Sequence, residues 1–347
     1  MLQKKYFNLK LISQYRNQLF GIAIISIILF HFSEDFNNAV QNSIIHLNQF
    51  SPKNLLVLAY YNYIRSIGVE IFVFLSGMGL YYSFSTNNNI IQFYKRRFQR
   101  IFVPYIIVAG VFWAIKDFYF HNSGIKAYIS DLSFYTFFTK GTSTIWFIGL
   151  MFFLYILFPL IYKIACNKFH TILLITFTCF FSIFLYHYMP DIYHNISIAS
   201  TRVPLFLLGV YTSKHIKNEV NISIFALSIF CIIGLFTKFL RVNLNFPDYM
   251  DRFMDSIYAC ALILIFTILI HVIIKLKFIN IFLIFIGNYS LELYMVHVTM
   301  RNLMKECELP TYRISYYFGM IIISIFIAIL LNRLSHLIKE TLFSKHN

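Results

Sequence analysis

Residues 16–32 read RNQLFGIAIISIILFHF, an apolar run that follows Arg16 and ends beside His31. The run is close to the roughly 20 apolar residues that a helix needs to cross a lipid bilayer. A charged or titratable group in such a helix is costly and usually faces a partner or a cavity. Two interpretations are open: the two side chains reach toward opposite headgroup layers, or they belong to a functional path.

The composition of the whole chain indicates an integral membrane protein. Its 347 residues are 59% hydrophobic and only 12% charged, and the mean hydropathy is +0.68. A soluble domain has about 45–50% apolar and about 25% charged residues. With only 7 prolines and no Gly/Ser-rich linker, we expect one domain over 1–347 with a core of about 15–335.

The cysteines and the N-terminus add two expectations. None of the five cysteines forms a CxxC pair, so neither a disulfide framework nor a metal site is expected. The N-terminal segment is basic and then apolar, but no small-residue cleavage site follows Phe32. We therefore expect a retained first helix rather than a signal peptide.

Ten apolar segments predict an all-α bundle of about ten membrane-spanning helices. The sixth is short and follows Arg202 and Pro204, so we expect it to be tilted or partly re-entrant. The expected ranges are 15–33, 63–85, 101–119, 144–163, 171–189, 202–214, 221–240, 254–274, 278–298 and 314–335.

Charged residues predict the orientation of this bundle. With an even number of crossings, more than half of the 29 basic residues fall on the side of the termini. Only two of the 14 acidic residues, Glu219 and Glu340, lie there. Basic residues favour the cytoplasmic side, so both termini are expected in the cytoplasm. The net charge of +15 then reflects membrane orientation and is no indication of nucleic-acid binding.

Polar groups within the apolar segments form two clusters in this topology. Ser290, Tyr294 and His297 share one helix face at i, i+4 and i+7, and an acidic residue such as Glu70 in an apolar stretch normally needs a partner. The outer cluster consists of His31, Glu70, Trp146, Arg202, Tyr294 and His297, and the inner cluster of Arg16, Lys95, Arg96, Arg97 and Arg100.

Each cluster also has a simpler explanation. The basic run from Lys95 to Arg100 is typical of a topology signal, and Trp146 and Tyr294 are typical of aromatic residues at a membrane interface. Two clusters on opposite sides of one bundle are harder to explain in this way. They suggest a path that receives an anionic molecule inside and acts on a polar molecule outside.

Several blocks, in order along the chain, resemble the acyltransferase-3 family of bacterial membrane-bound O-acyltransferases. They are ILFHF, GVEIFVFLSGMGLYYS, FYKRRFQRIFVPY, WFIGLMFFLYILFPL, RVPLFLLGV and IGNYSLELYMVH. The resemblance implies transfer of an acyl group, usually acetyl, from cytoplasmic acyl-CoA to an extracytoplasmic glycan. It also implies a bacterial plasma (inner) membrane location, with a cell-envelope glycan or lipid-linked saccharide and membrane lipids as partners.

The chain departs from the family pattern in its first helix. The pattern separates an arginine from the histidine by ten residues, which would place the arginine at position 20, and this chain has Phe20 there. Arg16 lies one turn earlier. At about 100° per residue, it is about 60° from the face of His31 and still looks toward the same side of the bundle.

The resemblance and the side-chain chemistry together give expected roles. Arg16, Arg96, Arg97 and Arg100 would bind the CoA phosphates. His31 would accept the proton of the attacking hydroxyl, and either Glu70 or Glu34 would orient its ring. Acyl-CoA is expected as a substrate, with no permanently bound cofactor. The residues expected to bind the acceptor or the oxyanion are Trp146, Arg202, Tyr294 and His297.

Two other classes of function remain open from the sequence. A transporter or exporter of a polysaccharide or its precursor could line its path with the same residues, although no internal repeat is found. A non-catalytic partner in polysaccharide assembly would keep the fold without the chemistry.

Overall fold

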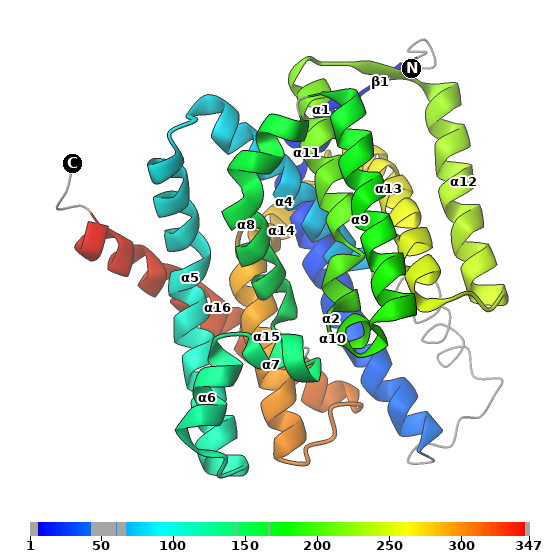
Figure 1. Cartoon of the computed structure of the whole chain (residues 1–347). Helices are drawn as coiled ribbons and strands as arrows, with labels where there is room; N and C mark the ends of the chain where they lie inside the picture. Colours follow the sequence, from blue (N-terminus) through cyan, green and yellow to red (C-terminus); the bar gives the residue numbers. More distant parts are fainter. Residues whose placement is uncertain (1–5, 43–59, 61–66, 143, 166, 344–347) are drawn as a thin grey trace. The chain divides into compact units, whose positions relative to one another are not determined.

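The computed structural model describes residues 6–42, 60, 67–142, 144–165 and 167–343. These residues are almost entirely helical, with two three-residue strands (Figure 1). Within this described part, nine helices are long and apolar enough to cross a membrane, and a bent helix pair is a tenth candidate. The predicted class, an all-α polytopic membrane protein, is confirmed.

Internal contacts divide the chain into two compact units. Unit 1 comprises Met1–Ile27, Asn62–Asn88 and Leu157–Asn288, and unit 2 comprises Ile28–Tyr61, Asn89–Ile156 and Tyr289–Asn347. Helices α2 (Arg16–Gln41) and α8 (Trp146–Ala165) contribute to both units. A single domain over 1–347 stays a prediction.

Unit 1 is built around the packing of α4 against α11. Helix α13 also packs on α4, α9 packs on α10 and α11, and α12 packs on α13. Strands β1 and β2 pair antiparallel, with Phe7 opposite Ile222. Its complete elements are β1 (Tyr6–Asn8), α1 (Lys10–Gln14), α4 (Ile67–Thr86), α9 (Lys168–Tyr188), α10 (Pro190–Ser200), α11 (Val203–Lys217), β2 (Asn221–Ser223), α12 (Ile224–Asn243), α13 (Asp248–Ile273) and α14 (Lys277–Asn288).

The α4–α11 contact depends on a glycine. A Cβ added to Gly209 would lie 2.2 Å from the backbone oxygen of Phe74, so only glycine lets the two backbones approach this closely. Small residues of this kind are typical of helix contacts in membranes. The contact buries Glu70, on α4, in unit 1.

Unit 2 is built from α5, α15 and α16 with the second half of α2. Helix α15 packs on α5 and α16, and α6 packs on α5, η1 and α7. The Asn89 side chain caps α5 by accepting a hydrogen bond from the Gln92 backbone at 3.0 Å. Its other elements are α5 (Ile90–Ala114), the π-helix η1 (Ile115–Phe120), α6 (Gly124–Leu132), α7 (Tyr135–Lys140), α15 (Ser290–Glu306) and α16 (Ile314–Phe343).

The prediction of one continuous helix over 278–298 is wrong. The segment 278–298 is broken at Tyr289 into α14 and α15. The residues before the break, Gly287 and Asn288, are weak helix formers. A Cβ at Gly287 would lie 1.9 Å from the backbone oxygen of Asn17, so a close backbone contact within unit 1 fixes the end of α14.

The other helices follow the expected segments with shifted ends. The sixth segment, 202–214, corresponds to α11, which forms one candidate span together with the preceding α10. Helices α6 and α7 were not expected. Residues 63–66 of the second segment lie outside the described residues.

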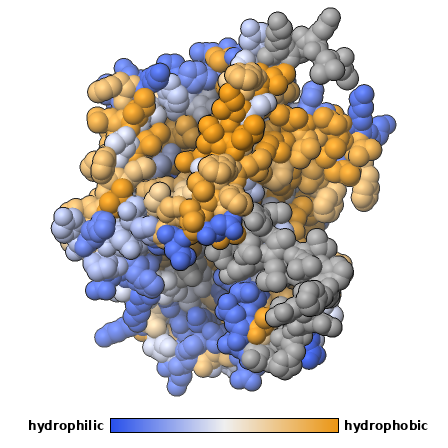
Figure 2. Space-filling view, turned by 90° about the vertical axis from the view of Figure 1, so that its right-hand side faces the viewer, coloured by the Kyte–Doolittle hydropathy of each residue, from blue (hydrophilic) through white to orange (hydrophobic). Residues whose placement is uncertain are grey.

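The surface of α12 shows why these helices need an apolar solvent. Figure 2, which faces the side of α12 in Figure 1, shows a broad apolar area. On α12 itself, four large side chains are more than half exposed: Phe225, Ile232, Phe236 and Phe239. A contiguous apolar surface of this kind marks contact with lipid or a partner.

Candidate active site

Two histidines from distant parts of the sequence lie together in unit 2. His31, on α2, and His297, on α15, stack with ring centroids 5.1 Å apart and an angle of 27° between the planes. His297 is fully buried, whereas His31 is partly exposed. Nδ1 of each ring is buried and has no hydrogen-bond partner among the described residues. The pair therefore offers unused ring nitrogens beside a partly accessible surface.

Tyr317, on α16, fixes the proton position on His297. Its hydroxyl lies 2.7 Å from the backbone oxygen of Ile28 and 2.9 Å from Nε2 of His297. A carbonyl can only accept, so the single hydroxyl proton of Tyr317 is donated to Ile28. The tyrosine oxygen therefore accepts from Nε2–H of His297. In a neutral ring this leaves the lone pair on Nδ1 of His297.

One turn further along both helices, an ion cluster joins α2 to α15. Nε of Arg301 donates to Asp35 at 2.9 Å, and Nη2 donates to Glu34 at 2.6 Å. Nζ of Lys305 lies 2.6 Å from Asp35 Oδ1. Two cations therefore face two carboxylates, and Asp35 is the more buried carboxylate, with a side chain 3% exposed against 36% for Glu34.

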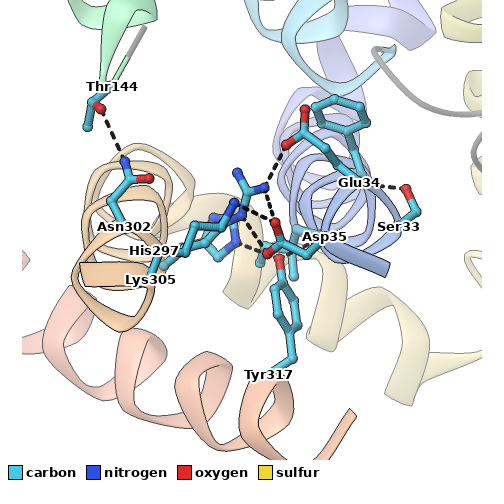
Figure 3. A network of polar contacts seen from close by, with 11 residues as sticks. Ser33, Glu34, Asp35, Thr144, His297, Asn302, Lys305 and Tyr317 are labelled. Carbon is cyan, nitrogen blue, oxygen red and sulfur yellow. Dashed lines mark hydrogen bonds and ion pairs between the residues drawn. The ribbon is translucent and has the colours of Figure 1, made fainter. Parts of the chain in front are cut away.

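Figure 3 shows how these groups converge. Glu34 and Asp35 project from α2 toward α15, which carries His297 and Lys305, while Tyr317 approaches from α16. Asn302 points away from this cluster and donates to Thr144 at 3.1 Å. His297, Arg301 and Lys305 share one face of α15 because they are spaced at i, i+4 and i+8.

Glu70 and Arg202 form a second charged site, in unit 1. Nη2 of Arg202 lies 2.7 Å from Oε1 of Glu70, and both side chains are almost fully buried. Arg202 is the residue directly before α11, and Pro204 follows it inside the first turn. The structure thus gives Glu70 a basic partner.

Neither carboxylate expected to orient His31 contacts it among the described interactions. Glu70 is paired with Arg202 and Glu34 with Arg301. The orienting role of either carboxylate stays a prediction.

The Arg16 side chain lies next to Phe20, the residue that stands where the family pattern would place an arginine. Its guanidinium carbon lies 6.0 Å from the ring centroid of Phe20, at the edge of cation–π range. The Phe20 ring in turn packs on Phe72 of α4 at 5.3 Å. The Arg16 side chain is exposed.

The side chains of the three arginines of α5 differ in their exposure and contacts. Arg96 is exposed. The guanidinium of Arg97 lies over the rings of Phe93 and Tyr155, at 5.7 and 5.9 Å from their centroids. Arg100 reaches buried Glu292 at 3.3 Å. Arg96 is therefore the one of the three that is most open to an anion.

The expected aromatic residues of the site lie beside each other on two helices of unit 2. Phe147 packs edge-on against Trp146, at 6.3 Å, and against Tyr294, at 5.4 Å. Trp146 and Tyr294 are both buried. Their expected roles in substrate binding stay predictions.

Sequence reasoning did not identify Asp35, Arg301, Lys305 and Tyr317. The spacing of His297, Arg301 and Lys305 on one helix face is a signal that could have found two of them. Tyr317 has no comparable local signal, because its contacts come from residues far away in the chain. Among the described residues, no group of His, Cys, Asp and Glu is placed to hold a metal ion.

Fold and site together define a class. The chain is a multi-pass membrane protein in which a buried histidine and a partly exposed one stack beside a charged cluster, an arrangement suited to proton transfer. The family model described as "Acyltransferase domain", that of the acyltransferase-3 family, matches residues 19–333. The chain therefore belongs to the acyltransferase-3 family, as its sequence blocks predict. No curated protein and no solved structure matches it.

Proposed function

We propose that this membrane acyltransferase transfers an acyl group, with acetyl as the expected one, from acyl-CoA to a hydroxyl of an extracytoplasmic carbohydrate. The observation that carries the proposal is the stacked pair of His31 and His297 within a chain of this family. His31 is the member of the pair with an accessible surface. A neutral imidazole is suited to accept a hydroxyl proton at neutral pH.

In the proposed reaction, His31 removes the proton from the acceptor hydroxyl while the hydroxyl oxygen attacks the thioester carbon. The carbon–sulfur bond then breaks, and the proton passes from His31 to the CoA thiolate. The products are an ester and free CoA–SH. Since one histidine accepts and returns the same proton, the step needs no metal and no redox partner.

The remaining residues have supporting roles in this proposal. The phosphates of CoA are bound by four arginines: Arg16, Arg96, Arg97 and Arg100. A guanidinium group can donate two parallel hydrogen bonds to the oxygens of one phosphate. Glu70 acts through Arg202, whose guanidinium it holds in place, and Arg202, Trp146 and Tyr294 contact the acceptor. His297 completes the site as the neighbour of His31.

Replacement of His31 by alanine tests the proposal directly. Purified His31→Ala protein should consume no acyl-CoA above the uncatalysed rate when an acceptor is present, while it inserts into the membrane at the normal level. The control is His336→Ala, which removes an exposed histidine of α16 paired with Glu340. Turnover of His31→Ala close to that of the parent protein would contradict the general-base role.

The donor site has a separate test. Arg96→Gln should raise KM for acyl-CoA and leave KM for the acceptor unchanged, because the charge removed faces the CoA phosphates in this proposal. Lys126→Gln, which removes an exposed cation on α6, is the control. Equal changes of both constants for Arg96→Gln would favour a role in membrane orientation.

A transporter is the alternative that the buried charges of unit 1 would fit. Lys238 and Asp255 form a buried pair at 2.8 Å, and intramembrane ion pairs often mark transport paths. Membership of the acyltransferase family favours the enzyme. A transporter would leave acyl-CoA unconsumed in the assay above.

A further inference from the structure

The ion pair between Arg301 and Asp35 lies one helical turn from the stacked histidines and is not used in the reaction proposed above. Asp35 follows His31 by four residues on α2, and Arg301 follows His297 by four residues on α15. Residues spaced at i, i+4 share one helix face, so the ion pair and the stack join the same two faces. Along each helix the two contacts are about 6 Å apart, at 1.5 Å per residue.

This ion pair is buried and its geometry is directional. Arg301 is 7% exposed and Asp35 is 5% exposed. Nε of Arg301 donates to Oδ2 of Asp35 at 2.9 Å, and Nη2 donates to Oδ1 of the same carboxylate. Two parallel hydrogen bonds of this kind fix the relative orientation of a guanidinium group and a carboxylate. The contact therefore restricts both sliding and rotation of α15 against the second half of α2.

The histidine stack alone would hold the two rings less firmly. Its ring centroids are 5.1 Å apart, and the attraction between aromatic rings is weak compared with the cost of breaking a buried ion pair. Nδ1 of either ring has no hydrogen-bond partner among the described residues. Because a catalytic group must be held within about 0.5 Å of its productive position, the stack needs a second, directional contact between the helices.

Glu34 and Lys305 are the outer members of the same cluster. Glu34 accepts from Nη2 of Arg301 at 2.6 Å, and Nζ of Lys305 lies 2.6 Å from Oδ1 of Asp35. Their side chains are 36% and 41% exposed, and ion pairs of exposed side chains contribute little because water screens them. Arg301 and Asp35 are therefore the members that fix the distance between the helices.

We propose that Arg301 and Asp35 are positioning residues that hold His31 against His297 in the geometry required for acyl transfer. The inference rests on the proposed function, which supplies the role of His31 as the base. Loss of the ion pair lets α15 move away from α2 beside the histidines, which exposes His297 and displaces His31 from the acceptor hydroxyl. The chemical step then slows, while acyl-CoA binds as before because neither residue is among those proposed to bind it.

The reactivity of the histidines toward diethyl pyrocarbonate tests the positioning without any substrate. The reagent modifies accessible imidazole rings, and peptide mass spectrometry gives the rate for each histidine. Arg301→Met removes the guanidinium group but keeps a long apolar side chain, and Asp35 retains Lys305 as a partner, so the variant can fold. His31 and His297 should react at least fivefold faster in this variant than in the parent protein. Unchanged rates would overturn the proposal.

Two controls separate positioning from general loosening of the protein. His336 is exposed and should react at the same rate in every variant. Asp255→Asn breaks the buried pair with Lys238 in unit 1, whose members are 6% and 1% exposed. This variant should lose stability and leave the rates of His31 and His297 as in the parent. Acceleration equal to that in the Arg301 variant would overturn the proposal, because any lost ion pair would then have the same effect.

Steady-state kinetics in the acyl-CoA assay completes the test. Arg301→Met should lower kcat at least tenfold and change KM for acyl-CoA less than twofold. Arg301→Lys should give an intermediate kcat, because it restores a cation opposite Asp35 without the two parallel hydrogen bonds. A kcat of Arg301→Met close to that of the parent would overturn the positioning role. A parent protein that consumes no acyl-CoA would refute the proposed function, and the histidine reactivities would still decide whether the ion pair holds the stack.

Discussion

His31 and His297 differ in how their rings are held. Tyr317 fixes His297 through Nε2, whereas Nδ1 of His31 has no hydrogen-bond partner among the described residues. The sequence placed both histidines in one outer cluster from the helix order alone, and the structure brings them together. It could not reveal Tyr317, whose partners Ile28 and His297 are 289 and 20 residues away along the chain.

Tyr317→Phe tests whether the fixed ring of His297 supports catalysis. The change removes the acceptor for Nε2–H of His297, and a lost hydrogen bond of this kind costs about 1 kcal/mol. We expect kcat to fall by roughly fivefold while KM for acyl-CoA stays unchanged. Steady-state kinetics of the purified protein measures both constants.

Tyr316 provides a matched control for this change. It is the adjacent residue and is 43% exposed, so Tyr316→Phe should leave both constants unchanged. A lower kcat in both variants would mean that the effect of Tyr317→Phe comes from general disturbance of α16. No change in either variant would show that the proton position on His297 is irrelevant to turnover.

The carboxylates Asp35 and Glu34 should differ strongly in their effect on stability. Asp35→Asn leaves the buried Arg301 with one carboxylate fewer, and such a change typically costs about 3–5 kcal/mol. Glu34 is partly exposed and, within the described part of the chain, pairs with Arg301, so Glu34→Gln should cost less than about 1 kcal/mol. Denaturant unfolding in detergent measures the difference, and equal destabilisation would contradict the buried cluster.

The positions of the long helices could be predicted from the sequence because of the membrane. Bilayer thickness demands apolar runs of about 20 residues, so helix positions could be read from composition. The break between α14 and α15 could not, because a contact between Gly287 and α2 determines where α14 ends. Helices α6 and α7 are also short, and α6 has no buried residues.

Replacing a glycine by alanine should have opposite effects on stability at a tightly packed and at an open helix position. Gly209 in the α4–α11 contact is the packed position. In Gly209→Ala the new methyl group would overlap the Phe74 backbone, so the helices must separate, at a cost of about 1–3 kcal/mol. Gly319, on α16, has no atom within 4 Å of an added Cβ. Gly319→Ala should therefore stabilise the protein by up to about 1 kcal/mol through helix propensity. Unfolding midpoints in detergent test the sign, and loss of stability in both variants would contradict the close packing.

For the whole molecule, the length of the α5 segment bears on how the chain crosses the membrane. Ile90–Phe120 is 31 residues long, or about 46 Å at 1.5 Å per residue. The hydrocarbon core is about 30 Å thick, so this segment extends beyond it. Lys95, near its start, and Lys140, at the end of α7, are both exposed.

The proposed mechanism requires that the donor and the acceptor approach from opposite faces. The positive-inside rule places Lys95 in the cytoplasm and Lys140 outside. Lys95→Cys and Lys140→Cys, each in a parent without other cysteines, test this prediction. The parent is needed because Cys307 is exposed. A membrane-impermeant thiol reagent added to intact cells should modify position 140 and spare position 95 until the membrane is opened. Modification of both positions in intact cells would refute the orientation, and transfer from a cytoplasmic donor to an external acceptor would lose its basis.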